Sequence, residues 1–310
     1  MKRVVVTGGA GFIGSHLAEE LVQRDYYVII LDDLSTGKME NMEDLLNRST
    51  VEFAKGSVAD QLLLENLFQD VAYVFHQAAI PSVPRSLENP RASHDVNVTG
   101  TLNVLLAARG SGVKKVIYAS SSSVYGDTPE LPKKEDMAPN PRSPYAVTKL
   151  AAEYYCQVFR EVFGLSTVSL RYFNVYGPRQ DPNSQYAAVI PKFINWVLLN
   201  SRPTIFGDGD QTRDFTFVKD AVQASILAAE TNAAGVFNAG SGRNITINGL
   251  ARMVLDFTGI GLEPIHQEPR PGDIWHSLAD ISKAKTFGYE PRYSLEEGLA
   301  ETIRSFRHAI

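Results

Sequence analysis

A glycine-rich stretch that directly follows an apolar run is the feature that most constrains the fold. Residues 4–6 are three valines, Gly8, Gly11 and Gly14 come next, and apolar side chains recur at helical spacing over 15–24. The pattern predicts a strand, a tight turn and a helix. Glycines at these positions let a pyrophosphate approach the backbone at the N-terminus of the helix, so the sequence indicates a dinucleotide-binding turn.

A pair of carboxylates ends the next predicted strand and indicates which dinucleotide binds. The apolar run 27–31 is followed by Asp32 and Asp33, at the distance where a carboxylate accepts hydrogen bonds from an adenosine ribose. A negative charge there repels a 2′-phosphate, which favours NAD over NADP. Lys38, the nearest cation, lies farther from the strand end than the acidic pair.

Strand-like and helical stretches alternate along the first part of the chain. The strands are expected over 4–7, 27–31, 51–54, 72–76, 116–120 and 166–172. Such alternation is typical of a parallel sheet with helices on both faces. We therefore expect an α/β protein, with a Rossmann-type doubly wound parallel sheet over 1–177 and a smaller mixed α/β substrate-binding domain over 178–310.

One later segment is expected to return to the first domain. Roughly residues 214–240 read as a strand over 214–218, a helix over 220–230 and a second strand over 236–239. This repeats the strand and helix alternation of the first part of the chain.

The composition fits a soluble enzyme and argues against several other classes. With 310 residues, 44% of them hydrophobic, the chain can bury one large core or two coupled ones. A net charge of −5 and the lack of a basic run argue against nucleic acid as a partner. No apolar run approaches 18 residues and no signal-like segment opens the sequence, so we expect no membrane contact and a cytoplasmic protein.

Cysteine and histidine usage argues against a metal centre. Cys156 is the only cysteine, which rules out an intrachain disulfide and a cysteine-based metal site. None of the six histidines are paired at ligand spacing on one helix, so no metal is expected. His76 ends a buried strand, and we interpret it as a core residue.

Tyr145 and Lys149 stand four residues apart at the start of a predicted helix. This spacing puts both side chains on one helix face. A nearby ammonium favours the phenolate, so we expect Lys149 to lower the pKa of Tyr145 and to let the phenol exchange a proton with a substrate hydroxyl near neutral pH. Taken alone, the pair could equally belong to a solvated surface.

A run of serines, which includes Ser121 and Ser122, follows the fifth predicted strand. It lies at the carboxyl edge of the sheet, where ligands bind in such folds. Hydroxyl groups there can hydrogen bond a substrate oxygen without adding charge. Together with Tyr145 and Lys149, the run makes the chain similar to a known family.

The chain resembles the extended short-chain dehydrogenases/reductases, and within them the nucleotide-sugar epimerases of the UDP-glucose 4-epimerase type. The resemblance extends from residue 2 to about residue 306. Its motifs lie at 7–14, 32–37, 77–79, 97–101, 120–126, 145–149, 171–174, 213–215 and 270–273.

The resemblance implies roles for individual residues. Tyr145 would take the proton of the sugar 4-hydroxyl, Ser121 would bond the 4-oxygen, and Lys149 would also contact the nicotinamide ribose. Besides Tyr145 and Lys149, the implied NAD-binding residues are Gly8, Gly11, Phe12, Ile13, Gly14, Asp32, Asp33, Ser35, Thr36, Gly37, Ser57, Val58, Gln77, Ala78, Ala79, Pro81, Asn97, Tyr172 and Phe173. Besides Tyr145 and Ser121, the implied substrate-binding residues are Val83, Ser122, Asn174, Ala188, Val189, Lys192, Thr204, Phe206, Arg213, Arg270, Asp273 and Ser277. The two arginines would meet the phosphates.

One position departs from the family pattern. Ser57 stands where many relatives carry an aspartate that bonds the adenine amino group. We expect either a lower affinity for NAD or partial substitution by Asp60, with the reaction unchanged.

The resemblance implies an NAD-dependent isomerase with a UDP-sugar substrate. NAD would remove hydride from C4 as Tyr145 removes the hydroxyl proton, the resulting 4-keto sugar would turn over, and hydride would return to its other face. UDP-glucose and UDP-galactose would be interconverted in this way. Ser277 is small where a bulky tyrosine excludes N-acetyl groups in epimerases of this type, so UDP-GlcNAc and UDP-GalNAc would also be accepted.

Other activities remain open. A UDP-glucuronate 4-epimerase or decarboxylase would resemble this chain, but related dehydratases and decarboxylases carry an acidic residue just before Val-Tyr-Gly, where this chain has Ser122 and Ser123. An NAD-binding regulatory module without turnover is a third possibility, although such modules commonly lose the tyrosine and the lysine.

The resemblance also implies a homodimer. In this family the helices that match 92–109 and 145–163 pair across a two-fold axis as a four-helix bundle. The apolar residues on these helices could equally pack within one subunit; they are Val96, Leu102, Leu105, Tyr154, Val158 and Phe159.

Overall fold

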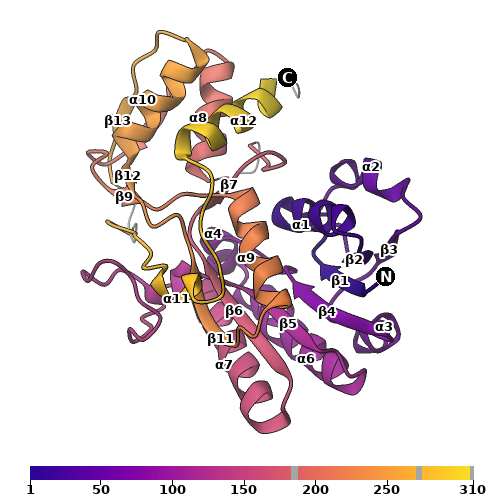
Figure 1. The fold of residues 1–310 in the computed structure, drawn as a ribbon. Coiled ribbons are helices and arrows are strands. Elements are labelled where there is room, and N and C mark those ends of the chain that lie inside the picture. The colour runs from indigo at the N-terminus through magenta and orange to yellow at the C-terminus, as the bar shows by residue number, and fades with distance from the viewer. Residues whose placement is uncertain (183–187, 270–273, 308–310) are drawn as a thin grey trace.

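A parallel sheet of seven strands forms the centre of the molecule, as the computed structural model of residues 1–182, 188–269 and 274–307 shows (Figure 1). The strand order is β11-β6-β5-β4-β1-β2-β3, and every neighbouring pair is parallel. The strands are β1 (Arg3–Thr7), β2 (Tyr27–Asp32), β3 (Val51–Lys55), β4 (Val71–His76), β5 (Lys115–Ser121), β6 (Ser166–Tyr172) and β11 (Gly235–Ala239). The predicted Rossmann-type fold is confirmed, and the first six strands differ from the expected ranges by at most one residue at either end.

Helices cover both faces of this sheet. They are α1 (Phe12–Gln23), α2 (Glu43–Leu46), α3 (Gln61–Leu67), α4 (Val83–Glu88), α5 (Pro90–His94), α6 (Gly100–Gly110), α7 (Pro144–Phe163) and α9 (Val218–Glu230). Helices α1 and α9 pack together on one face, and α3, α6 and α7 cover the other.

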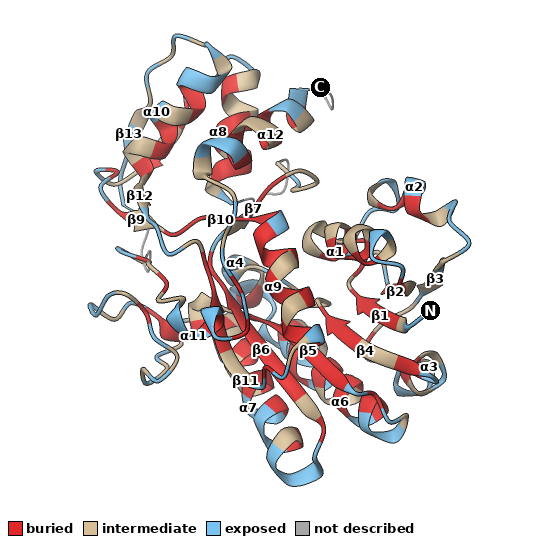
Figure 2. Ribbon diagram, viewed as in Figure 1, coloured by how far each residue is buried: buried red, intermediate tan, exposed pale blue. Residues whose placement is uncertain are grey.

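The apolar runs in the sequence are explained by this two-sided cover. Successive side chains of a strand point to opposite faces, so a strand that is buried on both faces has no polar alternation. Val4 and Val6 belong to the core under α1 and α9, whereas Val5 belongs to the core under α3, α6 and α7. Figure 2 shows the strands as the most continuously buried part of the fold.

Lys115, the first residue of the inner strand β5, ties the sheet to α9. Its buried ammonium donates to the carbonyl oxygens of Ala228 at 3.0 Å, Thr231 at 2.6 Å and Ala233 at 3.1 Å. Ala228 lies in the last turn of α9, where carbonyl groups have no partner within the helix, and Thr231 and Ala233 directly follow the helix. The segment expected to return to the first domain therefore contributes α9 to one face and β11 to the sheet edge.

A smaller helical unit lies above the carboxyl edge of the sheet in Figure 1. It is built from α8 (Val189–Leu198), α10 (Ile247–Thr258) and α12 (Leu295–Arg307). Its short strands are β8 (Thr204–Phe206), β9 (Thr212–Arg213), β12 (Ile245–Thr246) and β13 (Ile265–Gln267). Between the two units run β7 (Val175–Tyr176) and β10 (Thr216–Phe217), and α11 (Ser282–Lys285) packs against β11.

The strand predicted over 214–218 is wrong in detail. Two short strands, β9 and β10, flank Asp214 instead. The Asp214 carboxylate is buried and accepts backbone N–H groups from Ser241 at 2.8 Å, Gly242 at 3.0 Å and Ala279 at 3.0 Å. These hydrogen bonds replace the pairing of one continuous strand, because the chain must turn at Asp214 to bring its carboxylate to the three N–H groups.

Two predicted helices also differ from the structure. The first helix begins at Phe12, three residues before the expected start, because the glycine-rich turn is shorter than its sequence suggests. The helix predicted over 92–109 is interrupted by a π-helical turn at Asp95–Thr99, which lies between α5 and α6. The wider turn includes Asn97, whose side chain bonds outside the helix.

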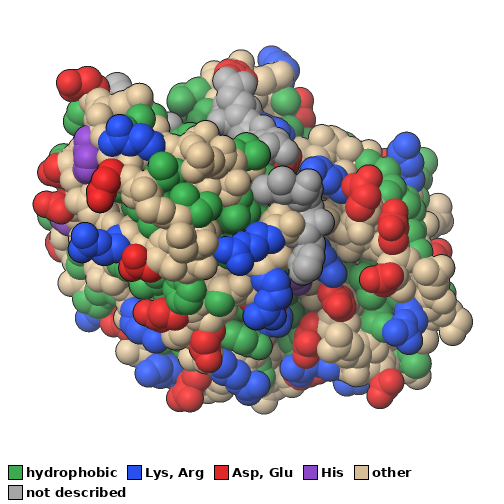
Figure 3. Space-filling view, turned by 90° about the horizontal axis from the view of Figure 1, so that it is seen from above, with side chains coloured by type: hydrophobic (Ala, Val, Ile, Leu, Met, Phe, Trp, Pro, Cys, Tyr) green, Lys and Arg blue, Asp and Glu red, His purple; other side chains and the backbone are tan. Residues whose placement is uncertain are grey.

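The surface carries charges of both signs. Figure 3 shows acidic and basic side chains interspersed over the face seen from above. Among the residues that the structure describes, no helix is long and apolar enough to cross a membrane. No group of three or more histidine, cysteine, aspartate or glutamate side chains in these ranges is arranged to hold a metal ion.

Candidate active site

The glycine-rich turn forms a cradle that side chains would fill. Gly8 has a φ of +69°, and a Cβ there would lie 2.7 Å from the backbone nitrogen of Ala78. A Cβ on Gly14 would overlap the carbonyl group of Gly8. Gly11 caps α1 without a side-chain hydrogen bond, and the first turn holds no acidic residue. The N–H groups at this helix end are therefore suited to a pyrophosphate, and the turn fits a dinucleotide.

The two aspartates after β2 differ in their surroundings. Asp32 is buried and accepts the backbone N–H groups of Ala10 at 2.9 Å and Leu34 at 2.8 Å, whereas Asp33 is exposed. Burial raises the pKa of the Asp32 carboxyl, and these two hydrogen bonds oppose the shift. A Cβ on Gly37 would lie 2.8 Å from the Asp32 carboxylate, so glycine lets the loop close over it. Carboxylate oxygens accept more than one hydrogen bond each, so Asp32 keeps capacity for ribose hydroxyls.

The remaining residues around the predicted adenosine site lie on neighbouring loops. Ser35 donates its backbone N–H to Asp33 at 2.9 Å, and Thr36 is exposed beside it. Lys38 lies 3.8 Å from Asp181 in an exposed ion pair, so its charge has a partner outside the ribose position.

Ser57 and Val58 lie between β3 and α3. The Ser57 hydroxyl accepts the N–H of Ala59 at 3.2 Å, and Val58 packs under Gly100. Asp60 caps α3 by accepting the N–H of Leu63 at 3.0 Å. Substitution of Asp60 for the absent adenine-binding aspartate therefore has to compete with this cap.

A buried polar network holds the loop after β4, which contains Gln77, Ala78, Ala79 and Pro81. Thr7 accepts the N–H of Ala78 at 3.2 Å, and its hydroxyl also contacts His76 at 2.7 Å. Asn97 accepts the N–H of Ile80 at 2.8 Å. His76 contacts the Thr101 hydroxyl at 2.9 Å with its other ring nitrogen, and burial lowers its pKa to about 3. The interpretation of His76 as a satisfied core residue is confirmed.

Tyr145 is fixed through its backbone at the start of α7. Its N–H donates to the buried hydroxyl of Ser86 on α4 at 3.0 Å. Its carbonyl accepts the hydroxyl of Thr148 at 2.8 Å, and Asn97 donates to the same hydroxyl at 3.0 Å. Ser143 caps the helix by accepting the N–H of Ala146 at 3.2 Å. The backbone that carries the phenol is therefore fixed at both its N–H and its carbonyl group.

Lys149 lies one turn further along the same face and is buried. Its ammonium donates to the carbonyl oxygen of Ala119 at 2.8 Å and lies 5.1 Å from the ring centre of Tyr118. The distance to the ring centre of Tyr145 is 5.9 Å. Burial lowers the pKa of Lys149 to about 8, and the charge of Glu153 opposes this shift.

The predicted direction of the Tyr145 pKa is wrong for the chain alone. Burial raises the pKa of the phenol, and the hydrogen bond with Ser121 is the influence that lowers it. The Lys149 ammonium is directed to a backbone carbonyl, so its effect on the phenol does not outweigh the loss of water.

The serine run forms the turn Ser122–Tyr125 directly after β5. Ser121 begins this turn by accepting the N–H of Ser123 at 3.1 Å. Its hydrogen bond with Tyr145 brings the predicted hydroxyl and phenol together. Ser122 is half-buried in the same turn, and the Ser123 hydroxyl is buried without a partner in the described part of the chain.

Tyr172 ends β6 opposite Ser121 of β5, and Phe173 directly follows it. The Tyr172 hydroxyl contacts Ser225 at 2.6 Å and accepts from Gln77 at 3.4 Å. Phe173 is fully buried against Tyr125, with ring centres 6.2 Å apart. Phe173 therefore packs against the serine turn, and Tyr172 connects the end of β6 to the loop after β4 and to α9.

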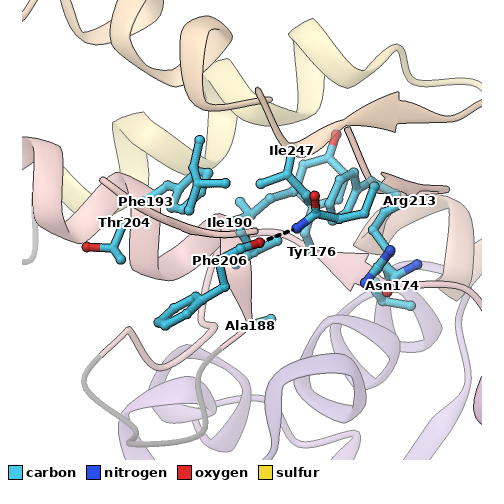
Figure 4. Close-up of a pocket in the computed structure, with 14 residues that line it drawn as sticks. Asn174, Tyr176, Ala188, Ile190, Phe193, Thr204, Phe206, Arg213 and Ile247 are labelled. Carbon is cyan, nitrogen blue, oxygen red and sulfur yellow. Dashed lines mark hydrogen bonds between the residues drawn. The ribbon is translucent and has the colours of Figure 1, made fainter. Parts of the chain in front are cut away.

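A pocket of about 290 Å³ lies between the end of β6 and the helical unit (Figure 4). It brings together six of the predicted substrate-binding residues: Asn174, Ala188, Val189, Thr204, Phe206 and Arg213. Figure 4 shows Arg213 and Asn174 at one end of the pocket and Thr204 and Phe206 at the other. The arrangement places a cation and an amide at one end of a largely apolar slot, which suits a nucleotide whose base is covered and whose phosphates meet the cation.

Other predicted substrate residues lie outside this pocket. Val83 is exposed on α4, Lys192 is half-buried on α8, and Ser277 is buried and donates its N–H to the carbonyl oxygen of Thr212 at 3.1 Å. Arg270 and Asp273 lie outside the described residues.

Several pocket residues were not predicted. They are Val175, Tyr176, Ile190, Ile205, Phe193, Gln211, Phe215 and Ile247. Ile190 and Phe193 lie on the apolar face of α8, which the sequence marks only as core. Ile247 comes from α10, and no feature of the sequence connects it with Asn174.

Comparisons with known proteins agree with this geometry. Residues 4–240 match the NAD dependent epimerase/dehydratase family. The chain is 40% identical over 310 residues to the UDP-glucose 4-epimerase of Mycolicibacterium smegmatis, covering 99% of each chain. It is also similar to the structure of UDP-N-acetylglucosamine 4-epimerase from Methanobrevibacter ruminantium in complex with UDP-N-acetylmuramic acid, with 45% identity, a TM-score of 0.97 and coverage of 100% and 99%.

A third similar structure is UDP-glucuronic acid 4-epimerase from Bacillus cereus in complex with UDP-glucuronic acid and NAD. It has 35% identity, a TM-score of 0.91, and coverage of 99% of this chain and 100% of that one. The family match covers well over half of the chain, and the glycine cradle, the acidic pair and the Tyr145–Lys149 centre fit NAD. The chain therefore belongs to the NAD dependent epimerase/dehydratase family, as an isomerase of the extended short-chain dehydrogenase/reductase type.

Proposed function

We propose that this chain is a UDP-hexose 4-epimerase that interconverts UDP-glucose with UDP-galactose and UDP-GlcNAc with UDP-GalNAc. The observation that carries the proposal is the convergence of Ser121, Tyr145 and Lys149 beside the glycine cradle, with a pocket of about 290 Å³ beyond the end of β6. The names of the similar proteins support a 4-epimerase, and they include forms that act on each of several UDP-sugars.

The residues of the chain divide the chemistry between them. When bound, NAD supplies the acceptor and donor of hydride and a positive charge beside the site. Tyr145 accepts the proton of the sugar 4-hydroxyl and returns it, Ser121 bonds the 4-oxygen, and Lys149 supports the developing phenolate. The sugar C4 passes through a ketone, and the configuration inverts when the other face of the sugar is presented.

The lining of the pocket supports a sugar that turns over while the nucleotide stays bound. Asn174, Phe206 and Arg213 would hold the nucleoside diphosphate, and Arg270 and Asp273 would complete its grip. The hexose would meet mostly uncharged groups, such as the hydroxyls of Ser121 and Ser122. Strong binding of the nucleotide with weak binding of the hexose leaves the ketone free to rotate.

A turnover assay over five substrates tests the proposal. Purified protein is incubated with UDP-glucose, UDP-galactose, UDP-GlcNAc, UDP-GalNAc or UDP-glucuronate, and the products are separated. We expect interconversion within the first two pairs. Turnover of UDP-glucuronate alone would favour the glucuronate epimerase or decarboxylase, and bound NAD without any turnover would favour a regulatory module.

The same fold hosts dehydration and decarboxylation, so the serine turn matters. Ser122 and Ser123 stand where an acid is required for the extra proton transfer of those reactions. A serine hydroxyl does not ionise near neutral pH and so cannot replace an acidic side chain in this proton transfer. This absence of an acid in the turn favours simple inversion at C4.

Acceptance of the N-acetyl group rests on the small size of Ser277. Ser277 is buried and directly follows His276, which forms a parallel β-bridge with Thr212 of β9. This bridge brings Ser277 close to Arg213, the residue after Thr212. Ser277→Tyr should lower kcat/KM for UDP-GlcNAc by about 10- to 100-fold, and that for UDP-glucose much less, because added volume meets only the larger sugar. Ser282→Tyr, on the exposed start of α11, is the control. Equal losses on both sugars would show that Ser277 is not a gate.

A homodimer is the proposed assembly. Val147, Tyr154, Val158 and Val162 form an exposed apolar stripe on α7, whereas Leu105 and Phe159 are buried within the subunit. Their spacing of seven, four and four residues keeps them on one helix face, as a helix-pairing interface requires. Sedimentation of the wild type and of Val158→Glu tests the proposal, and a wild-type monomer would contradict it.

A further inference from the structure

A buried carboxylate lies one helical turn beyond Lys149 and has no part in the reaction described above. Glu153, on α7, has a side chain only 3% exposed and pairs with Arg171 of β6. The Arg171 Nε donates to Oε1 at 3.0 Å and its Nη2 to Oε2 at 2.8 Å. A buried ion pair is costly to desolvate, and apolar residues in its place often serve stability equally well. Its presence here calls for a role other than stability.

The carboxylate connects α7 to the catalytic end of β5. The hydroxyl of Ser120 donates to Glu153 Oε1. Ser120 stands between Ala119, whose carbonyl accepts the Lys149 ammonium at 2.8 Å, and Ser121. Glu153 therefore fixes the strand segment that carries both the lysine's acceptor and the catalytic serine.

The carboxylate also supplies charge. Apart from Glu153 and the cationic Arg171, the titratable groups around Lys149 are His76 on β4, Tyr118 on β5, and Tyr145 and Cys156 on α7. Burial raises the pKa of both tyrosines, raises that of Cys156 to about 12 and lowers that of His76 to about 3. All four are neutral at pH 7. Within the described ranges, Glu153 is the anion that keeps Lys149 protonated against its burial.

We propose that Glu153 is a positioning residue of the catalytic centre, whose carboxylate holds the end of β5 against α7 and faces the Lys149 ammonium with a negative charge. The proposal rests on the proposed function for its kinetic test. Arg171 orients the carboxylate through its two hydrogen bonds, and Tyr125, whose ring centre lies 4.6 Å from the guanidinium, covers Arg171. The Tyr125 hydroxyl donates to the buried Asn238 at 2.6 Å. The pair is thus anchored to β11 as well.

Replacement of both partners separates positioning from stability. In Glu153→Met combined with Arg171→Leu both partners of the ion pair are removed together, so we expect the melting temperature to stay within about 5 °C of the wild type. The kcat for the UDP-sugars should fall by about 10- to 100-fold, with KM within about twofold because the nucleotide pocket is untouched. The alkaline limb of the kcat–pH profile should move to lower pH, because Lys149 loses its proton more easily without the carboxylate.

Two further variants complete the test. Lys219→Met with Glu301→Met removes an exposed ion pair of 2.9 Å away from the site and should change neither kcat nor the pH profile. Arg171→Lys keeps the charge but not the two-bond geometry, and should retain the position of the alkaline limb. If the paired variant keeps the wild-type kcat and alkaline limb, Glu153 is only structural and the proposal is overturned.

Titration of Lys149 by NMR gives a readout that does not need turnover. With 13C-labelled lysine, and with Lys149→Met to assign the signal, the ammonium should titrate at lower pH in Glu153→Gln than in the wild type. If the paired variant does not fold, this single variant is measured below its melting temperature and decides the question. Failure of the wild type to turn over UDP-sugars would overturn the proposed function, whereas an unchanged Lys149 titration would overturn the role of Glu153.

Discussion

The two halves of the molecule build their parts of the site by different means. On the cofactor side, the predicted contacts follow the ends of adjacent parallel strands, and much of the fit depends on the backbone: Gly8 and Gly14 leave a space that any side chain would fill. On the substrate side, the pocket is lined by residues of the helices α8 and α10 and of the strands β7, β8 and β9. These strands are only two or three residues long. The fit there depends on side chains.

This difference separates what each half can change. A backbone cradle tolerates little substitution, so changes on the cofactor side should affect every substrate alike. A pocket of side chains can be altered one residue at a time, so changes on the substrate side should alter the choice or affinity of the UDP-sugar. The proposed catalytic residues of β5 and α7 lie on the cofactor side and should follow the first pattern.

The largest expected effect is that of Tyr145→Phe. Loss of the hydroxyl removes the proton acceptor, so kcat should fall by about 10³-fold for every UDP-sugar, within the range of general acid–base catalysis. NAD binding should persist, because the backbone of Tyr145 is held by Ser86 and Thr148. Tyr154→Phe, an exposed tyrosine of the same helix, is the control. Undiminished inversion in Tyr145→Phe would remove the whole proposed mechanism.

Gly14→Ala should come next in size. The added Cβ would overlap the Gly8 carbonyl, so the turn must open and NAD affinity should fall by about 100-fold, or about 3 kcal/mol. Fluorescence titration with NAD measures the loss, and the relative activity on different sugars should not change. Gly110→Ala, where nothing lies within 4 Å of the new Cβ, should leave NAD binding intact. A change of sugar preference in Gly14→Ala would break the separation of the two halves.

The same division explains how far the sequence could be interpreted. The first six strands were predictable because a strand buried on both faces is a continuous apolar run, and the strand ends then placed Gly8, Asp32 and Ser121 on one edge. That Tyr145 and Lys149 share one face of α7 was predictable because four residues make about one helical turn. These are local relations along the chain.

The parts that the sequence did not predict depend on distant contacts. Asp214 breaks the strand expected around it because its carboxylate binds a loop that lies some thirty residues later and Ala279 beyond that. Ile247 lines the pocket because α10 packs there, and the spacing of apolar residues in the sequence does not predict such a long-range contact. The pKa of Tyr145 is set by how much water burial removes, and spacing from Lys149 carries no information about that.

On the substrate side, Arg213→Gln should have a smaller and more selective effect. The arginine lies at the polar end of the pocket, and loss of its charge should raise KM for UDP-sugars by about 10- to 100-fold, as expected for a hydrogen bond to a charged group. NAD affinity should stay unchanged. Arg202→Gln, which loses contacts to the carbonyls of Glu263 and Pro264 on the surface, is the control. A loss of NAD affinity in Arg213→Gln would show that the two halves are coupled.

The smallest expected effect is one on stability, and its sign is opposite: Lys149→Met removes a group of the proposed catalytic centre and should nevertheless stabilise the chain. The folded-state pKa of Lys149 is about 8, against 10.5 in the unfolded chain. Between these values the unfolded chain binds more protons, so the contribution of Lys149 to the free energy of unfolding rises with pH there. Below pH 8 the full penalty of burying the ammonium remains, at most about 3 kcal/mol.

Methionine removes that penalty but also the hydrogen bond to Ala119, which is worth about 1 kcal/mol. Near pH 7, without added NAD, the variant should therefore unfold in urea with a free energy about 1–2 kcal/mol above the wild type. The advantage should shrink as pH rises toward 10, because the wild-type lysine then becomes neutral at no cost. A difference that stays constant from pH 6 to 10 would mean that Lys149 is not strained by burial, and that stability and catalysis do not compete on the cofactor side.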